Sequence, residues 1–303
     1  MKIRCKGLAN KSARDEVLDV YFCEIEFDGK QISNGICDPK NDSQETIELN
    51  WNQDDLDREI GSVIDAYLKL HLLSNKCVLP NSINLDGLFK SLPNVVWTNQ
   101  GPVSIDEIEN KLNDSKVSQN NLYVRSLDKF PCLTDYIIPK NVRIADARRV
   151  RLGAYLSEGT TVMHEGFVNF NAGTLGPSMI EGRISAGVTI GKNSDIGGGA
   201  STMGTLSGGN DIKISIGENC LLGANSGLGI PLGDNCTIEA GLYITGGSKI
   251  TKYNSNNEPE SVIKASELAG CNNLLFIRNS QTGAIEAKIN PKSVALNEEL
   301  HKN

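Results

Sequence analysis

An aliphatic residue recurs at every sixth position through much of the stretch from Ile144 to Ile250. Four positions after it the side chain is usually small. A period of six fits neither an amphipathic helix nor an alternating strand, and it is typical of a parallel β-helix built from hexapeptide repeats. The clearest run of aliphatic positions is Ile144, Val150, Leu156, Val162 and Val168, continued by Thr174 and Ile180.

The period follows from the geometry of such a coil. Each hexad supplies one short strand and one corner, and three hexads close a triangular turn that stacks on the next at about 4.8 Å. The aliphatic side chain points into a narrow prism that accepts few rings, consistent with the aromatic content of 5%. One hexad cannot bury its apolar residue alone, so the coils must stack to form a core.

The repeat has breaks, and these are where we expect function. Ile184 follows Ile180 after four residues instead of six, and Leu232 follows Leu228 in the same way. The segment from Met203 to Asp211 predicts an excursion from a coil. Functional groups on a solenoid are commonly carried by such loops and by surfaces shared with neighbours.

The chain on either side of the repeat is expected to fold separately. We predict an α/β domain over residues 1–120 without a catalytic motif, a linker and entry to the solenoid over 121–143, a β-helix over 144–250 and a small β extension over 251–303. Local patterns add further expectations. These are strands over 17–27, 95–98, 261–264, 273–279 and 284–289, helices over 50–75, 85–92 and 104–112, polar linker or insertion over 113–121 and 252–260, and a short helix or frayed end over 296–303.

Composition excludes several classes of function. The net charge of −7 argues against general nucleic-acid binding. None of the eight cysteines forms a C-x-x-C pair, so a zinc site is not expected, and Cys220 and Cys236 are interpreted as small buried residues of the repeat. No apolar leader segment follows Met1 and no stretch has the length of a membrane span, so we expect a cytoplasmic protein with no membrane partner.

Six dense segments on this scaffold carry a more specific signal. Together they closely resemble the tetrahydrodipicolinate N-succinyltransferase family, in the longer form best known from actinobacteria. The resemblance is strong over about residues 140–303 and weak before them. The segments are M-H-E-G-F-V-N-F-N from Met163, E-G-R-I-S from Glu181, G-G-G-A-S from Gly197, G-A-N-S-G from Gly223, E-A-G-L-Y from Glu239 and N-N-L-L-F-I-R-N-S from Asn272.

This resemblance implies a mainly β fold with a left-handed β-helix, assembled as a homotrimer with active sites between subunits. It implies transfer of a succinyl group from succinyl-CoA to the amine of a small dicarboxylate, ring-opened tetrahydrodipicolinate. The product would be N-succinyl-2-amino-6-oxopimelate, on the diaminopimelate route to lysine.

Glu181 occupies the family's catalytic glutamate position, beside the four-residue step. It can act as a nucleophile that forms an acyl anhydride or as a general base, and the residue type alone does not choose. Arg183 is placed by the resemblance at the acyl donor, where a guanidinium can hold the succinyl carboxylate in bidentate fashion. The simpler alternatives are a solvated corner carboxylate and a surface salt bridge.

The resemblance also implies a set of contacts to the CoA donor. Small residues among them allow the pantetheine arm to approach the backbone, although the prism itself also requires small residues there. Ile277 stands where the family has a second basic residue, which removes one phosphate partner. The contacts are Gly198, Ser201, Ala224, Glu239, Ala240, Gly247, Lys264, Ile277, Arg278, Asn279 and Ser280.

A structural magnesium ion is the remaining expectation from the resemblance. Glu165 matches a carboxylate that binds Mg²⁺ near the trimer axis, where three copies make an oxygen site. Arg148 stands where a second acid would be expected, which makes a second metal doubtful. His164 is interpreted as structural, because no serine or cysteine partner is evident.

Two alternatives remain open at the level of sequence. The first is a hexapeptide acyltransferase with a different acyl donor or acceptor. The second is a trimeric solenoid without catalytic activity.

Overall fold

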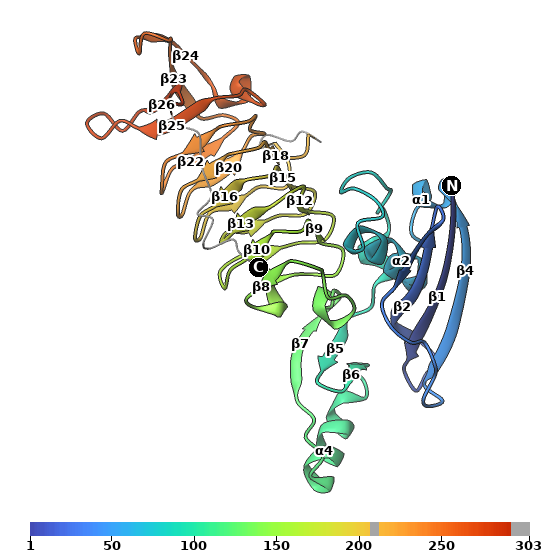
Figure 1. Ribbon diagram of the computed structural model, residues 1–303. Helices are drawn as coiled ribbons and strands as arrows, with labels where there is room; N and C mark the ends of the chain where they lie inside the picture. The colour runs from blue at the N-terminus through green and yellow to red at the C-terminus, as the bar shows by residue number, and fades with distance from the viewer. Residues whose placement is uncertain (207–211, 292–303) are drawn as a thin grey trace. The chain divides into compact units, whose positions relative to one another are not determined.

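Figure 1 shows the computed structural model, which describes residues 1–206 and 212–291. The chain divides into two compact units, Met1–Ile138 and Pro139–Asn303. The expected short helix or frayed end over 296–303 and the last part of the expected excursion, residues 207–211, lie outside the described residues. Among the described residues no helix is long and apolar enough to cross a membrane.

The first unit is built on an antiparallel sheet of order β3-β2-β1-β4. Burial alternates along β1, as expected for a strand with one face in the core. Helix α2 packs against β2. A second sheet has the order β6-β5-β7. The elements are β1 Lys2–Lys11, β2 Val17–Phe27, β3 Lys30–Ser33, β4 Gln44–Asn52, α1 Gln53–Asp57, α2 Val63–Ser74, α3 Leu88–Ser91, β5 Val95–Thr98, β6 Gly101–Val103, α4 Ile108–Ser118 and β7 Val124–Asp128.

The strands expected over 17–27 and 95–98 are confirmed by β2 and β5, whereas the single helix expected over 50–75 is wrong. Residues 50–52 belong to β4, and two helices follow with a break at residues 58–62. Arg58 is extended, and Ser62 caps α2 by accepting from the Asp65 amide. The buried Lys69 stabilises the break, because its Nζ donates to the carbonyls of Leu56, Arg58 and Asn84.

The linker expected over 113–121 is wrong over most of its length, because α4 continues to Ser118. None of the residues of α4 is buried. A helix without a buried face leaves no apolar period in the sequence, which explains the missed prediction.

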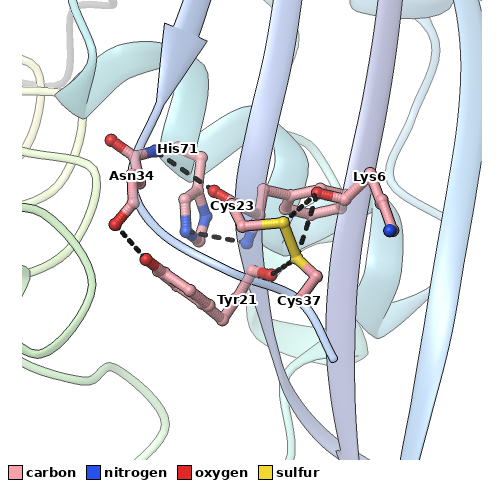
Figure 2. The surroundings of a disulfide bond; sticks show 7 residues. Lys6, Tyr21, Cys23, Asn34, Cys37 and His71 are labelled. Carbon is pink, nitrogen blue, oxygen red and sulfur yellow. Dashed lines mark hydrogen bonds between the residues drawn. A yellow bond between two sulfur atoms is a disulfide. The ribbon is translucent and has the colours of Figure 1, made fainter. Parts of the chain in front are cut away.

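A disulfide joins Cys23 on β2 to Cys37, fourteen residues later (Figure 2). Asn34 fastens the loop between them, since its backbone amide donates to the Cys23 carbonyl (2.7 Å) and its Nδ2 to the Phe22 carbonyl (3.1 Å). Beneath the strand, His71 Nε2 accepts from the Phe22 amide at 3.4 Å, and burial lowers the pKa of His71 to about 4. No pattern in the sequence indicated this disulfide.

The second unit is a stack of coils whose strands form three parallel faces, as the hexad period predicted. The repeating aliphatic side chains from Val150 onward are almost fully buried inside the coils. Face 1 contains β8 Arg143–Ile144, β10 Thr161–Val162, β13 Ser178–Ile180, β16 Ser194–Ile196, β19 Leu221–Leu222, β21 Thr237–Ile238 and β25 Leu274–Arg278. Face 2 contains β11 Phe167–Val168, β14 Arg183–Ile184, β17 Ser201–Thr202, β20 Gly227–Gly229 and β22 Tyr243–Thr245. Face 3 contains β9 Tyr155–Leu156, β12 Gly173–Thr174, β15 Thr189–Ile190 and β18 Ser215–Ile216.

The breaks in the period correspond to irregular coils. Val162, Ile180, Ile196 and Leu222 occupy the same place on successive coils, which therefore take 18, 16 and 26 residues. The short coil has a two-residue corner between β13 and β14. The long coil carries the expected excursion, whose described part includes an antiparallel bridge between Thr205 and Lys213.

Asparagines in the left-handed conformation turn the chain at the corners that lead into face 1. The φ angles of Asn193, Asn219, Asn235 and Asn273 lie between 55° and 59°. Asparagine tolerates this region because its short amide bonds locally. Asn193 Nδ2 donates to Asn219 Oδ1 (3.3 Å) and Asn235 Nδ2 to Asn273 Oδ1 (3.0 Å), so the corners also bond to one another.

Small buried residues follow Asn193, Asn219 and Asn235, as the repeat requires: Ser194, Cys220 and Cys236. Cys220 and Cys236 are both fully buried in the stack, which confirms their interpretation as structural residues. A hydrogen bond with the Cys236 sulfur, together with burial, raises the pKa of the Cys220 thiol well above its usual range.

The β-helix ends in a small β extension. The strands β23 Lys249–Tyr253 and β24 Pro259–Lys264 form a hairpin, so the polar insertion expected over 252–260 is partly strand. The expected strands over 273–279 and 284–289 are confirmed by β25 and by β26 Ile285–Ile289, which pair antiparallel. β26 also runs parallel to β23 and closes the sheet.

Candidate functional site

The corners that lead from face 1 to face 2 lie one above another and form a single edge of the stack, here called the site edge. It consists of residues 163–166, 181–182, 197–200, 223–226 and 239–242, which connect the face 1 and face 2 strands of five successive coils. The structure therefore brings together many of the residues singled out in the sequence. Those on the site edge are Glu165, Glu181, Gly198, Ala224, Glu239 and Ala240.

Backbone hydrogen bonds hold the site edge in register from coil to coil. The amide of Gly199 donates to the carbonyl of Glu181 (3.3 Å), and the amide of Asn225 donates to Gly198 (2.9 Å). The amide of Gly241 donates to Ala224 (2.8 Å). Each corner is thus positioned by the corner of the adjacent coil.

Glu181 lies half-buried in the two-residue corner between β13 and β14. Its amide donates to the Ile196 carbonyl at 2.8 Å, which fixes its backbone on the next coil. Gly182 is required beside it, because a Cβ there would lie 2.3 Å from the Ala200 carbonyl oxygen. The shortened corner thus sets the direction of the Glu181 side chain.

Two carboxylates of the site edge converge on Gly198. A Cβ at Gly198 would lie 3.5 Å from Oε2 of Glu165 and 3.5 Å from Oε2 of Glu181. The two oxygens are therefore within twice that distance of each other. The absence of a side chain at Gly198 leaves space in front of both carboxylates for a ligand group.

Arg183 and Ser201 are neighbours on face 2, where their strands pair directly. The guanidinium Nε donates to Ser201 Oγ at 3.0 Å and Nη2 donates to the same oxygen at 2.5 Å. The Arg183 side chain is exposed. Ser201 therefore fixes the direction of a cationic group two residues from Glu181.

Glu239 and Arg278 meet at the far end of the site edge. Oε2 of Glu239 accepts from the backbone amide of Arg278 at 2.7 Å, and the Glu239 amide donates to the Phe276 carbonyl at 2.9 Å. Arg278 Nη1 donates to the Gly283 carbonyl at 3.2 Å. The end of β25 is thus joined to the site edge.

Asn279 is held by a polar cluster in the β extension. Its Nδ2 donates to Glu286 Oε1 at 2.8 Å, and Tyr253 donates to the same oxygen at 3.0 Å. Lys288 pairs with Glu286 at 2.8 Å. The ion pair with Lys288, together with these hydrogen bonds, lowers the pKa of the Glu286 carboxyl.

Gly247 and Lys264 are not on the site edge. They lie near each other where β22 leaves face 2, since the amide of Ser266 donates to the Gly246 carbonyl (3.0 Å) and that of Ala265 to the Ser248 carbonyl (2.9 Å). Gly247 and Lys264 therefore form a second group of expected donor contacts, separate from those on the site edge and at the start of the face 2 strands.

Asp195 is a candidate that the sequence reasoning missed. It lies on β16 and is paired with Met179 of the adjacent coil, two residues before Glu181. Burial, together with the charge of Glu181, raises the pKa of the Asp195 carboxyl to about 6. The repeat allows a carboxylate at an outward strand position, so Asp195 does not break the hexad pattern. The one signal in the sequence is that the residues at the same place on the adjacent coils, Met179 and Leu221, are uncharged.

Two family models match the chain. One is described as the hexapeptide repeat of succinyl-transferase and matches residues 213–246, and the other as the middle part of tetrahydrodipicolinate N-succinyltransferase and matches residues 92–131. The 2,3,4,5-tetrahydropyridine-2,6-dicarboxylate N-succinyltransferase of Pseudomonas putida is 58% identical over 245 residues, which is 81% of this chain and 71% of that protein. The protein of the same name from Vibrio cholerae is 55% identical over 242 residues, or 80% and 71% of the two chains.

The chain belongs to the tetrahydrodipicolinate N-succinyltransferase family.

A solved structure agrees with this membership. The crystal structure of a 2,3,4,5-tetrahydropyridine-2-carboxylate N-succinyltransferase from Campylobacter jejuni superposes with a TM-score of 0.84 at 32% identity, covering 96% of this chain and 93% of that one. Similarity over 81% of the chain reaches well before residue 140, and one family model lies within the first unit. The weak resemblance expected there understated the relationship.

The described residues of a single chain do not supply a complete metal site. They contain no group of three His, Cys, Asp or Glu side chains that could hold an ion. Glu165 is exposed and its Oε2 lies near Gly198, whereas Arg148 forms an ion pair with Asp146 at 3.1 Å. The Arg148 side chain offers no oxygen ligand, and Mg²⁺ binding at Glu165 stays a prediction.

Proposed function

We propose that this protein transfers a succinyl group from succinyl-CoA to the amine of ring-opened tetrahydrodipicolinate. The products are N-succinyl-2-amino-6-oxopimelate and CoA, on the diaminopimelate route to lysine. The relatives carry the name of this activity. The observation that supports the proposal in the structure is the position of Glu181 in a shortened corner of the site edge, two residues before the Ser201-bound Arg183.

The chemistry follows from these two groups. The Arg183 guanidinium binds the free carboxylate of the succinyl group. Glu181 then attacks the thioester carbonyl, the CoA thiolate leaves, and a mixed anhydride forms on Glu181. The amine attacks the anhydride carbonyl and releases the Glu181 carboxylate together with the amide product, and the proton lost by the amine ends on the CoA thiolate. In the alternative, Glu181 acts as a general base and the amine attacks the thioester directly.

The CoA arm is proposed to run along the site edge past Gly198, Ala224 and Ala240. These positions leave the backbone accessible, as an extended ligand needs. Two cationic groups, Arg278 at the far end of the site edge and Lys264 after β24, offer the phosphates local positive charge on a chain of net charge −7. Ile277, Asn279 and Ser280 complete the proposed donor contacts.

The assembly proposed from family membership is a homotrimer of left-handed β-helices with active sites between subunits. The parallel faces and the coils of 16 and 18 residues support a β-helix of this kind. Mg²⁺ at the trimer axis, held by three Glu165 carboxylates, is proposed only as a structural ion. No catalytic step depends on it.

The decisive experiment replaces Glu181 by alanine. We expect succinyl transfer to fall on the order of 10³-fold or more, because the group that receives the acyl chain or the proton is gone. Purified protein is incubated with succinyl-CoA and the dicarboxylate while free thiol is followed. Glu218→Ala, which removes an exposed carboxylate paired with Lys192, is the matched control and should retain activity.

The same assay separates the alternatives. Turnover of acetyl-CoA but not succinyl-CoA would indicate an acyltransferase with another donor, and a wild-type protein without turnover or CoA binding would indicate a non-catalytic solenoid. Mass spectrometry after incubation with succinyl-CoA alone distinguishes the two roles of Glu181. A succinyl group attached to Glu181 supports the anhydride, and its absence under single-turnover conditions favours the base.

A further inference from the structure

The outward side chains of face 2 form a ladder from coil to coil. Direct strand pairing places Phe167 beside Arg183, Arg183 beside Ser201, Ser201 beside Gly227 and Gly227 beside Tyr243. Arg183 and Ser201 are already proposed to contact the donor. The same ladder ends on β22, in the upper part of the stack in Figure 1, with an aromatic residue that has no assigned role.

Tyr243 lies over Gly227. A Cβ on Gly227 would approach the Cδ2 and Cε2 atoms of the Tyr243 ring to 2.0 Å, so the ring occupies the space that a side chain would fill. Gly227 is buried, whereas Tyr243 remains 45% exposed. The pair, here called the Tyr243 platform, therefore presents part of an aromatic ring to solvent beside Ser201.

The Tyr243 platform lies between the two groups of proposed donor contacts. β22 begins after the corner that holds Glu239 and Ala240, and it ends before Gly247. Three coil steps separate Tyr243 from Arg183, or about 14 Å along the stack at the usual strand spacing. Because Tyr243 directly follows the corner 239–242, a ligand that runs along the site edge from the coil of Arg183 to the Gly247 end of β22 passes beside this ring.

We infer that Tyr243, lying over Gly227, packs against the pantetheine arm of the CoA donor and sets the affinity for that donor. The inference rests on the proposed function. The arm carries a dimethyl group and two amides, which pack well on an aromatic face. The contact uses the ring and not the hydroxyl, so Phe should substitute for Tyr.

The test uses four variants of the full-length protein and two succinyl thioesters. Tyr243→Ala removes the ring, Gly227→Ala displaces it, and Tyr243→Phe retains it. Tyr123→Ala is the control, because Tyr123 is similarly exposed, at 52%, and belongs to the first unit. The donors are succinyl-CoA and succinyl-N-acetylcysteamine, which lacks the dimethyl part of the arm and the nucleotide.

For Tyr243→Ala and Gly227→Ala we expect the KM for succinyl-CoA to rise by about three- to tenfold, with kcat changed by less than about twofold. KM for the short donor and for the dicarboxylate should not change, and Tyr243→Phe and Tyr123→Ala should resemble the wild type. An unchanged KM in Tyr243→Ala, an equal rise for both donors, or dissociation of the wild-type oligomer in that variant would overturn the inference.

Calorimetric titration with CoA alone keeps this result separate from the proposed function. If the wild type binds CoA without transferring succinyl, the proposed reaction is wrong, and the platform is still tested by the CoA affinity of Tyr243→Ala. If that affinity equals the wild-type value, the platform does not contact the donor.

Discussion

At the scale of single residues, the Arg183 side chain shows how a short hydroxyl side chain positions a charge. Ser201 Oγ accepts from two nitrogens of the guanidinium, and the register of β14 and β17 brings the two residues opposite each other. A flexible cation on a solvated face would lose considerable rotamer entropy on binding an anion. The contact with Ser201 reduces that loss before the donor arrives.

Replacement of Arg183 by alanine should therefore weaken binding of a succinyl donor more than that of an acetyl donor. Loss of a charge-assisted contact predicts a rise of roughly 10- to 100-fold in the KM for succinyl-CoA. The KM for acetyl-CoA, which has no free carboxylate, should change little. Lys192→Ala, which removes an exposed cation paired with Glu218, is the control. Equal weakening of both donors would contradict the carboxylate clamp.

Asp195 predicts a pH dependence of the reaction. Its pKa is raised to about 6 by burial and by the charge of Glu181, so it is mostly protonated at pH 5 and mostly ionised at pH 7. The proposed reaction releases a proton from the attacking amine, and an Asp195 carboxylate close enough to feel the charge of Glu181 can take it up only when ionised. We therefore predict that kcat/KM rises through about pH 6.

Asp195→Asn should remove that inflection from the pH profile while leaving the fold intact. The measurement is kcat/KM between pH 5 and 8 for both proteins, with Asp234→Asn as a control at the corner that leads into face 1. If Asp195→Asn keeps the wild-type inflection, or if the wild type shows no inflection near pH 6, Asp195 does not control the pH dependence.

At the scale of elements, the corners of the β-helix explain which glycines are indispensable. Gly166 and Gly182 occupy equivalent corners of successive coils, and a Cβ on either would lie 2.3 Å from a carbonyl oxygen of the adjacent coil. The two coils approach so closely because their backbone groups bond directly, as in any parallel sheet.

Gly182→Ala should accordingly destabilise the β-helix by about 1–3 kcal/mol, because the neighbouring backbone must move. Thermal unfolding followed by circular dichroism measures the change. Gly247→Ala is the control for stability, since its Cβ would have no heavy atom within 4 Å. A Tm for Gly182→Ala as high as that of the control would show that the corner is more adaptable than its geometry suggests.

Elements with a strict period were predictable, and elements without one were not. The hexads determined the three faces because each aliphatic residue must point inward. The four-residue step at Ile180 also located the corner that carries Glu181. In contrast, α4 overlaps the helix expected over 104–112 but buries nothing, so no apolar period indicated its continuation to Ser118. The break after α1 depends on Lys69, whose partners lie 11 to 15 residues away along the chain. Asp195 was missed because its pKa depends on a neighbouring coil and not on its own hexad.

At the scale of the whole molecule, the proposed trimer makes a direct prediction about mass. Light scattering on the purified protein should give about three times the 32.7 kDa of one chain. Active sites between subunits also predict that specific activity falls on dilution to concentrations at which the trimer dissociates. A monomer with undiminished activity would refute the placement of the sites between subunits.

The hydrogen bonds that join successive corners of the site edge fix the distances between the residues on it. Glu181, Gly198, Ala224 and Ala240 are spaced by whole coils, so the gap between the reacting carboxylate and the distal contacts changes only in increments of about 4.8 Å. A substitution cannot lengthen it slightly, as it can in a site built from loops. Selection for a longer or shorter carrier arm would have to add or delete an entire coil, so the length of the donor is the property of this enzyme least open to gradual change.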